Sequence, residues 1–319
     1  MASTDGHATP ASTPRNRSPG GSPRSRSPSG TPRSPSSREA FFAAKVLDLQ
    51  ERLAPTLVAH SEAARFLSAK KGDVAKAAKL YQRCLAWRAE ANIDGILDER
   101  EPTAEEAALG SLYSPVVLDG TDLQGRPVMY SHMGKIDMAA LSVRGVSVPV
   151  VARRHIRELE RCRRRLIEQQ AEREGDPYRP PAVPPEAAPD GSGRPARAGH
   201  VLIVDVEGGV VGRFLGAWKL WAEVARLEGN YYPHMMARCV VIHAPPVANW
   251  AFGLCRKSFL DPATAERVSL HSDRDASVAL REVLSEEVMQ QLPPGVLSTD
   301  VAGDGGGKKG AAGGSGTSR

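Results

Sequence analysis

The chain has 319 residues, a formal net charge of +5 and four cysteines, and its length allows one or two domains. Six arginines against Asp5 and Glu39 give residues 1–40 a charge of +4, so the rest of the chain is close to neutral. Charge alone therefore gives no reason to expect nucleic-acid binding by the folded part. The cysteines lack the spacing of zinc sites, which predicts reduced structural residues in a cytosolic protein.

The two ends of the chain differ from the middle in composition. Residues 1–40 are mostly Ser, Thr, Pro, Gly and Arg and cannot bury enough apolar surface to fold, which predicts a disordered head. Residues 298–319 are rich in Gly and predict a flexible tail. Seven Ser or Thr residues of the head precede proline. They are either proline-directed phosphorylation sites or part of a tail without special use: Thr9, Thr13, Ser18, Ser22, Ser27, Thr31 and Ser34.

Residues 41–110 predict a helical leader. We expect helices over Phe41–Ala54, over Ser61–Ala69 with Ser61 as its N-cap, and over Asp73–Ala91 with Asp73 as its cap. The third helix carries apolar residues at helical spacing, which predicts one buried stripe. Its members are Val74, Ala77, Ala78, Tyr81 and Leu85.

Residues 111–297 predict an α/β domain. It opens with strands over Val116–Asp119 and Pro127–Met133 and a long charged helix over Val150–Glu174, with Pro149 in its first turn. Residues 175–199 are dense in Pro and Ala and too long for an ordinary loop, which predicts a disordered insertion.

Strands and helices then alternate. The expected elements are the strand Val201–Val206, the helix Arg213–Glu228 closed by Gly229, the strand Arg238–His243, the helix Val247–Lys257, the strand Arg267–Leu270 and the helix Ala276–Leu284. The first of these strands is continuously apolar, as expected when both faces are buried. The alternation predicts a mostly parallel sheet with crossover helices.

Several short segments together resemble the CRAL-TRIO lipid-binding domain family, of the type of the yeast phosphatidylinositol-transfer proteins. The leader offers Arg65-Phe66-Leu67, Lys70-Lys71-Gly72-Asp73-Val74 and Trp87-Arg88. The α/β part offers Gly125-Arg126-Pro127-Val128, Asp205-Val206-Glu207-Gly208, Asn230-Tyr231-Tyr232-Pro233, His243-Ala244-Pro245 and Phe259-Leu260-Asp261-Pro262. Each segment is unspecific alone, but their order over about residues 60–293 is typical of this family.

The resemblance implies a helical leader packed on a sheet that floors a deep apolar pocket closed by a gating helix. It implies binding of one hydrophobic molecule, such as a phospholipid, for intermembrane transfer or lipid sensing. We expect Leu202, Val204 and Val241 to face the pocket. The expected gate residues are Val247, Trp250, Phe252, Leu254 and Phe259, because Trp and other apolar groups suit a lipid–water boundary.

The same resemblance suggests which residues contact the head group of the lipid. In phosphatidylinositol-transferring relatives a basic leader residue, an acid after the Tyr-Tyr-Pro segment, and Thr and Lys after Phe-Leu-Asp-Pro hold the inositol phosphate. The corresponding candidates are Lys70, Lys71, His234, Thr264 and Arg267. His234 replaces the acid and so removes an acceptor for inositol hydroxyls. The positions that carry hydroxyls in choline-lipid binders hold His200 and Leu202, which argues against that mode.

We predict no catalytic residues, no metal site and no cofactor other than the bound lipid as ligand. Asp205 is interpreted as a buried carboxylate bonded to a helix N-terminus, and His243 as a satisfied polar group at a strand end. The arginines of residues 150–174 favour a solvated face with local ion pairs over an acidic-lipid or RNA surface. No signal sequence or membrane span is visible, so we expect a cytoplasmic protein, peripheral at membranes. The alternative function is a protein-interaction scaffold with a degenerate pocket, whose partners the sequence does not identify.

Overall fold

The computed structural model describes residues 37–99, 103–179, 199–209, 211–258 and 262–297. The predicted tail and nearly all of the predicted head and insertion lie outside these residues. Two boundaries were wrong. Helix α1 (Ser37–Leu53) begins inside the predicted head. The first residues of the predicted insertion pack against the leader, where the Pro177 carbonyl accepts a hydrogen bond from the His60 amide at 2.9 Å.

The leader consists of α1, α2 (His60–Ala69) and α3 (Val74–Glu90), which share a hydrophobic core. Asp73 caps α3 as predicted, since its side chain accepts a hydrogen bond from the Lys76 amide. The prediction for Ser61 was wrong, because α2 begins one residue earlier, after Ala59, and Ser61 is buried within the first turn.

Five strands form one sheet in the order β1-β2-β3-β4-β5: β1 (Val116–Leu118), β2 (Val128–His132), β3 (His200–Asp205), β4 (Met236–Ile242) and β5 (Val268–Leu270). Only β1 pairs antiparallel, and the other pairs are parallel. This confirms the predicted mostly parallel sheet. Every residue of the central β3 is buried, as its unbroken apolar run predicted.

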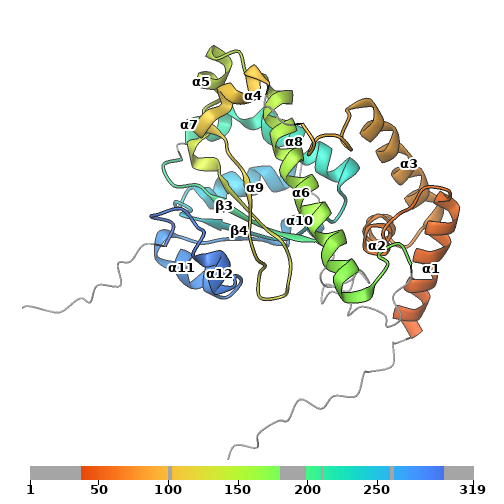
Figure 1. The fold of residues 1–319 in the computed structure, drawn as a ribbon. Helices are drawn as coiled ribbons and strands as arrows, with labels where there is room; N and C mark the ends of the chain where they lie inside the picture. The colour runs from red at the N-terminus through yellow and green to blue at the C-terminus, as the bar shows by residue number, and fades with distance from the viewer. Residues whose placement is uncertain (1–36, 100–102, 180–198, 210, 259–261, 298–319) are drawn as a thin grey trace, which may run out of the picture. The chain divides into compact units, whose positions relative to one another are not determined.

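Helices cover both faces of the sheet (Figure 1). On one face, α11 (Asp273–Arg281) and α12 (Glu286–Met289) pack against Val201 and Ile203 of β3. On the other, α6 (Val148–Glu174) and α8 (Trp218–Tyr231) lie over Leu202 and Val204. Short helices complete the domain: α4 (Ala104–Leu109), α5 (Met138–Val143), α7 (Val211–Gly216), α9 (Ala248–Ser258) and α10 (Pro262–Ala265). In the described ranges no helix has the length and apolar character needed to span a bilayer.

The helices near the C-terminal half differ from the prediction in their ends. The single helix expected over residues 213–228 is two helices, α7 and α8, separated at Ala217. Gly229 does not end α8, which continues to Tyr231. Pro233 ends it instead, because a residue before proline is disfavoured in the helical region, and Tyr232 has φ −126° and ψ 50°. Helix α11 begins three residues before the predicted Ala276, and α12 was not predicted.

The leader joins the α/β part through aromatic and ionic contacts. The rings of Trp87 and Tyr231 stack with centroids 4.0 Å apart. Next to them the Arg88 guanidinium donates two hydrogen bonds to the Glu160 carboxylate of α6, at 2.8 and 3.0 Å. The Tyr232 hydroxyl donates to the same carboxylate at 2.6 Å. Two short segments of the family resemblance, Trp87-Arg88 and Tyr231-Tyr232, therefore meet in space.

Candidate functional site

A cavity of about 280 Å³ lies between the sheet and the helices on the face covered by α6 and α8. Strands β3, β4 and β5 form its floor, and α6, α8, α9 and the segment after β2 form its walls. Most lining side chains are apolar, and the polar or charged ones are His155, Arg213, Glu228 and Thr264. The apolar ones include Met133, Ile136, Val206, Trp221, Val224, Met236, Cys239, Val268 and Leu270.

The three residues predicted to face a pocket all line this cavity. Leu202, Val204 and Val241 point from β3 and β4 toward it, and the register pairs Val204 with Val241. The intervening Val201 and Ile203 belong to the core on the opposite face of the sheet. Alternation along a strand therefore separates the cavity from the main core.

The predicted gate residues are distributed over both sides of the α9 region. Val247 and Phe252 line the cavity. Trp250 is 56% exposed, while Leu254 is half-buried. Phe259 lies outside the described residues. The structure therefore separates Trp250, which is exposed, from Phe252, which lines the cavity.

Three of the predicted head-group residues are found near the start of β4. Thr264 lines the cavity. The Arg267 guanidinium donates to the Met236 carbonyl at 3.0 Å, and its other terminal nitrogen lies 2.9 Å from Nδ1 of His234. Met236 is itself a lining residue, so Arg267 and His234 border this end of the cavity.

Lys70 and Lys71 are placed differently. They follow the last turn of α2, where Lys70 is its C-cap and Lys71 is exposed with φ 53°. Neither lysine lines the cavity in the part of the chain that the structure describes. The described contacts do not join them to Thr264 or Arg267.

A polar pair on the cavity wall was not predicted. Nε2 of His155 on α6 lies 2.6 Å from Oε1 of Glu228 on α8, and both residues line the cavity. The Tyr113 hydroxyl lies 3.2 Å from Nδ1 of the same imidazole. Glu228 falls on the same face of α8 as Trp221, Val224 and Ala225. This helical spacing could have placed Glu228 on the cavity wall from the sequence alone.

The pKa of the Glu228 carboxyl is set by its surroundings. Burial raises the pKa of the Glu228 carboxyl, but the hydrogen bond and charge of His155 outweigh burial and hold that pKa below its usual value. His200 lies at the start of β3 and interacts with Glu228 and His155. Burial lowers the pKa of His200 to about 4, so this imidazole is neutral at neutral pH.

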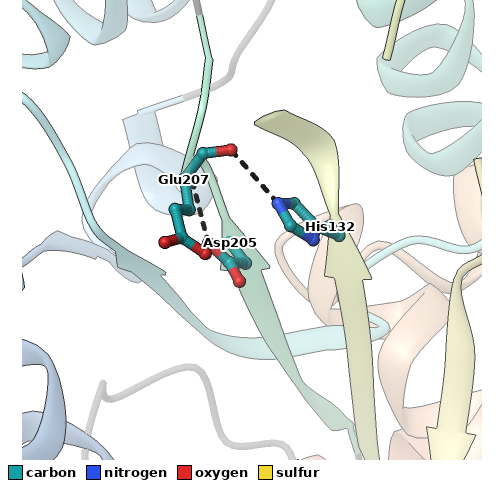
Figure 2. A group of neighbouring side chains, drawn as sticks. All are labelled: His132, Asp205 and Glu207. Carbon is teal, nitrogen blue, oxygen red and sulfur yellow. Dashed lines mark hydrogen bonds between the residues drawn. The ribbon is translucent and has the colours of Figure 1, made fainter. Parts of the chain in front are cut away.

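Figure 2 shows a second polar group at the carboxyl ends of β2 and β3, formed by His132, Asp205 and Glu207. Their ligand atoms lie within 4.8 Å of one another. Asp205, however, already accepts hydrogen bonds from the Tyr130 hydroxyl at 2.6 Å and the Glu207 amide at 2.9 Å, and it pairs with Nδ1 of His243 at 2.8 Å. These partners, and not a helix N-terminus, hold Asp205, which corrects the prediction. Both carboxylate oxygens of Asp205 are therefore already engaged by protein groups.

The fold is an α/β domain with helices on both faces of a mostly parallel sheet. On the face covered by α6 and α8 it encloses an apolar cavity. Residues 113–292 match the family model described as CRAL/TRIO domain. The chain belongs to this family, as the short segments of the sequence indicated.

The proteins to which this chain is similar include Sec14 cytosolic factors and a plant phospholipid-transfer protein. The chain is 25% identical over 229 residues to the SEC14 cytosolic factor of Candida glabrata, covering 70% of this chain and 67% of that protein. It is 24% identical over 262 residues to the Sec14 cytosolic factor of Schizosaccharomyces pombe, covering 81% and 82%. It is 25% identical to the phosphatidylinositol/phosphatidylcholine transfer protein SFH13 of Arabidopsis thaliana, covering 83% of this chain and 39% of that protein. The crystal structure of Sfh5 shares the fold, with a TM-score of 0.51, 15% identity and coverage of 73% and 68%.

Proposed function

We propose that this protein binds a single lipid in the cavity, most readily a phospholipid such as a phosphoinositide, for transfer between membranes or for lipid sensing. The observation that carries the proposal is the apolar cavity over β3 and β4. Each CH₂ group moved from water into such a space contributes about 0.8 kcal/mol. The Arabidopsis relative, named for phosphatidylinositol and phosphatidylcholine transfer, supports the same ligand class.

The size of the cavity implies a moving wall. Its volume of about 280 Å³ is at the lower limit of small-molecule pockets, which span about 300–1,000 Å³. Two acyl chains need more space, so α9 would have to move outward to admit a phospholipid. The exposed Trp250 suits contact with a bilayer surface, because indole is favourable at the lipid–water boundary. Arg256 and Lys257, both exposed on the same helix, suit its phosphates.

A test of cavity and gate compares two variants in a vesicle-to-vesicle transfer assay. Leu202→Trp fills the cavity and is expected to reduce bound lipid at least tenfold. Trp250→Ser removes only the exposed indole, so we expect the protein to keep bound lipid, measured by native mass spectrometry, while transfer slows several-fold. Normal lipid content in folded Leu202→Trp protein would contradict the cavity assignment. Unchanged transfer by Trp250→Ser would contradict the role of α9.

The proposed phosphate site consists of Thr264, Arg267 and His234 at the start of β4. An Arg guanidinium suits a phosphate because it can donate two parallel hydrogen bonds. Lys70 and Lys71 would contribute only if the leader and the cavity rim approach each other when lipid binds.

Arg267→Ala is expected to weaken binding of phosphatidylinositol by about 1.5–3 kcal/mol, the range for a hydrogen bond to a charged group. Arg274→Ala, in the exposed first turn of α11, provides the matched control. The measurement is the partition of labelled lipid between protein and vesicles. Equal affinities in the two variants would show that the phosphate sits elsewhere.

The alternative is a protein-interaction scaffold with a degenerate pocket. It was based on the departures at His200, Leu202 and His234. The open apolar cavity favours lipid binding over this alternative, because Leu202 contributes an apolar wall instead of blocking the space. Native mass spectrometry of the purified full chain separates the two functions: co-purified lipid supports the first, and its absence after exposure to vesicles supports the scaffold.

A further inference from the structure

The pair His155 and Glu228 lies on a mostly apolar cavity wall whose other polar or charged lining residues are Arg213 and Thr264, and the phosphate site described above does not use the pair. The side chain of His155 is 1% exposed, whereas that of Glu228 is 25% exposed and therefore offers surface to a ligand. We propose that the cavity recognises a compact amphiphile whose hydroxyl group donates a hydrogen bond to the Glu228 carboxylate inside the cavity. The proposal rests on the proposed function, since it requires that the cavity holds a hydrophobic molecule.

The hydrogen bonds of His155 determine what Glu228 can still accept from a ligand. Nε2 of His155 donates its proton to Oε1 of Glu228, and Nδ1 of the same ring faces the Tyr113 hydroxyl at 3.2 Å. Within the described residues His155 supplies the one hydrogen bond that this carboxylate receives. A carboxylate has room for about four hydrogen bonds, so Glu228 retains acceptor capacity toward the cavity.

Acceptor sites of the Glu228 carboxylate that stay without a donor are unfavourable, and this favours ligands that can donate a hydrogen bond. A carboxylate that faces an apolar space needs hydrogen-bond donors, because removal from water is otherwise unfavourable. A ligand hydroxyl supplies a donor, an ether supplies none, and a ligand carboxylate adds a like charge. Two neighbouring groups do not reverse this preference. His200 is neutral at neutral pH, and the guanidinium of the lining residue Arg213 lies 3.5 Å from the carboxylate of Asp137.

The rest of the cavity determines the shape of the ligand. Trp221, Val224 and Ala225 lie on the same face of α8 as Glu228 and are lining residues. A ligand with its hydroxyl at Glu228 would lay its hydrocarbon part along these side chains and over Leu202. With α9 in its present position, the volume of about 280 Å³ fits one chain or a compact ring system, whereas two acyl chains require α9 to move outward.

The experiment measures displacement of the fluorophore N-phenyl-1-naphthylamine from the purified full chain. The three competitors are 1-decanol, decyl methyl ether and decanoate, at neutral pH. We expect decanol to compete at a concentration at least tenfold lower than the ether, and decanoate to be the weakest. In Glu228→Gln the preference for decanol over decanoate should fall at least tenfold. Glu223→Gln is the matched control, because Glu223 lies on the same helix but is not a lining residue.

Two results would overturn the inference: equal competition by decanol and the ether in the unaltered protein, or the same decanol preference in both variants. The first comparison needs no variant, so it decides the matter even if Glu228→Gln fails to fold. Binding of the fluorophore with equal displacement by all three competitors would reject only the role of Glu228. A protein that binds neither fluorophore nor phospholipid would reject the proposed function as well.

Discussion

Replacing Arg88 by leucine is expected to lower the free energy of unfolding by about 3–5 kcal/mol, the usual effect of removing one partner of a buried ion pair. The side chains of Arg88 and Glu160 are 7% and 6% exposed, so water cannot replace the lost guanidinium. The loss is a large share of the about 5–15 kcal/mol that stabilises an ordinary domain. The measurement is urea unfolding followed by far-ultraviolet circular dichroism.

Two further proteins separate the ion pair from general damage to α3. Arg83→Leu changes an exposed arginine of the same helix and should alter stability by less than about 0.5 kcal/mol. The double variant Arg88→Leu/Glu160→Leu should regain part of the loss, because no unpaired carboxylate remains buried. A single Arg88→Leu protein as stable as the Arg83→Leu protein would show that the pair contributes nothing.

The fold was predictable where one local pattern determines an element. The unbroken apolar run of β3 predicted a strand buried on both faces, and Asp73 predicted the start of α3. The sequence could not show that Trp87 of the leader stacks on Tyr231, because no local pattern links residues so far apart. It also misplaced the end of α8, where the restriction before Pro233 outweighs the helix-breaking tendency of Gly229.

The charged helix α6 shows why part of the site was missed. Its dense arginines and glutamates indicated a solvated face with local ion pairs. Local pairs do form, as between Arg161 and Glu158 at 2.7 Å. The face is not simply solvated, however: Arg157 reaches Glu106 of α4, Arg163 donates two hydrogen bonds to Glu62 of α2 at 2.9 Å, and Glu158 is fully buried. The helix is therefore an ionic junction between the leader and the α/β part. His155 faces the cavity from the same helix, and its partner Glu228 is a carboxylate at a position where the stripe of α8 predicts an apolar residue.

By contrast, alternation along β3 and β4 was sufficient to locate Leu202, Val204 and Val241 on the cavity face. The head-group residues depend on how three separate loops meet. Arg267 and His234 are hydrogen-bonded, but in the described ranges the lysines of the leader are not among the residues that line the cavity. Residues brought together only by tertiary packing cannot be grouped from spacing.

We expect the free energy of unfolding to depend on pH because two histidines, His60 and His200, are buried. Burial lowers the pKa of both His60 and His200 from about 6.5 to about 4. Between these values the unfolded chain binds protons that the folded protein excludes, so stability rises with pH. The stabilising effect is thus complete above about pH 6.5 and is lost as the pH falls toward 4. A difference of this size corresponds to about 3 kcal/mol for each histidine.

The acidic groups change at lower pH and can be distinguished. The Glu62 carboxyl is buried, which raises its pKa, but Arg163 outweighs burial and lowers that pKa to about 2. Its contribution is therefore lost only as the pH falls from about 4.5 toward 2. A decline in stability between pH 6.5 and 4.5 is consequently assigned to histidines.

The measurement is the urea midpoint of unfolding at intervals from pH 7 to pH 4.5, for the unaltered protein and for His60→Leu, His200→Leu and the double variant. Each replacement should remove its own share of the decline, because leucine binds no proton in either state. The double variant should show a nearly flat profile over this range. The slope with pH is the decisive quantity, since a leucine that packs poorly shifts every midpoint by a similar amount without changing the slope. A double variant that retains the full decline would show that other groups take up the protons, and that His60 and His200 are as easily protonated in the folded protein as in the unfolded chain.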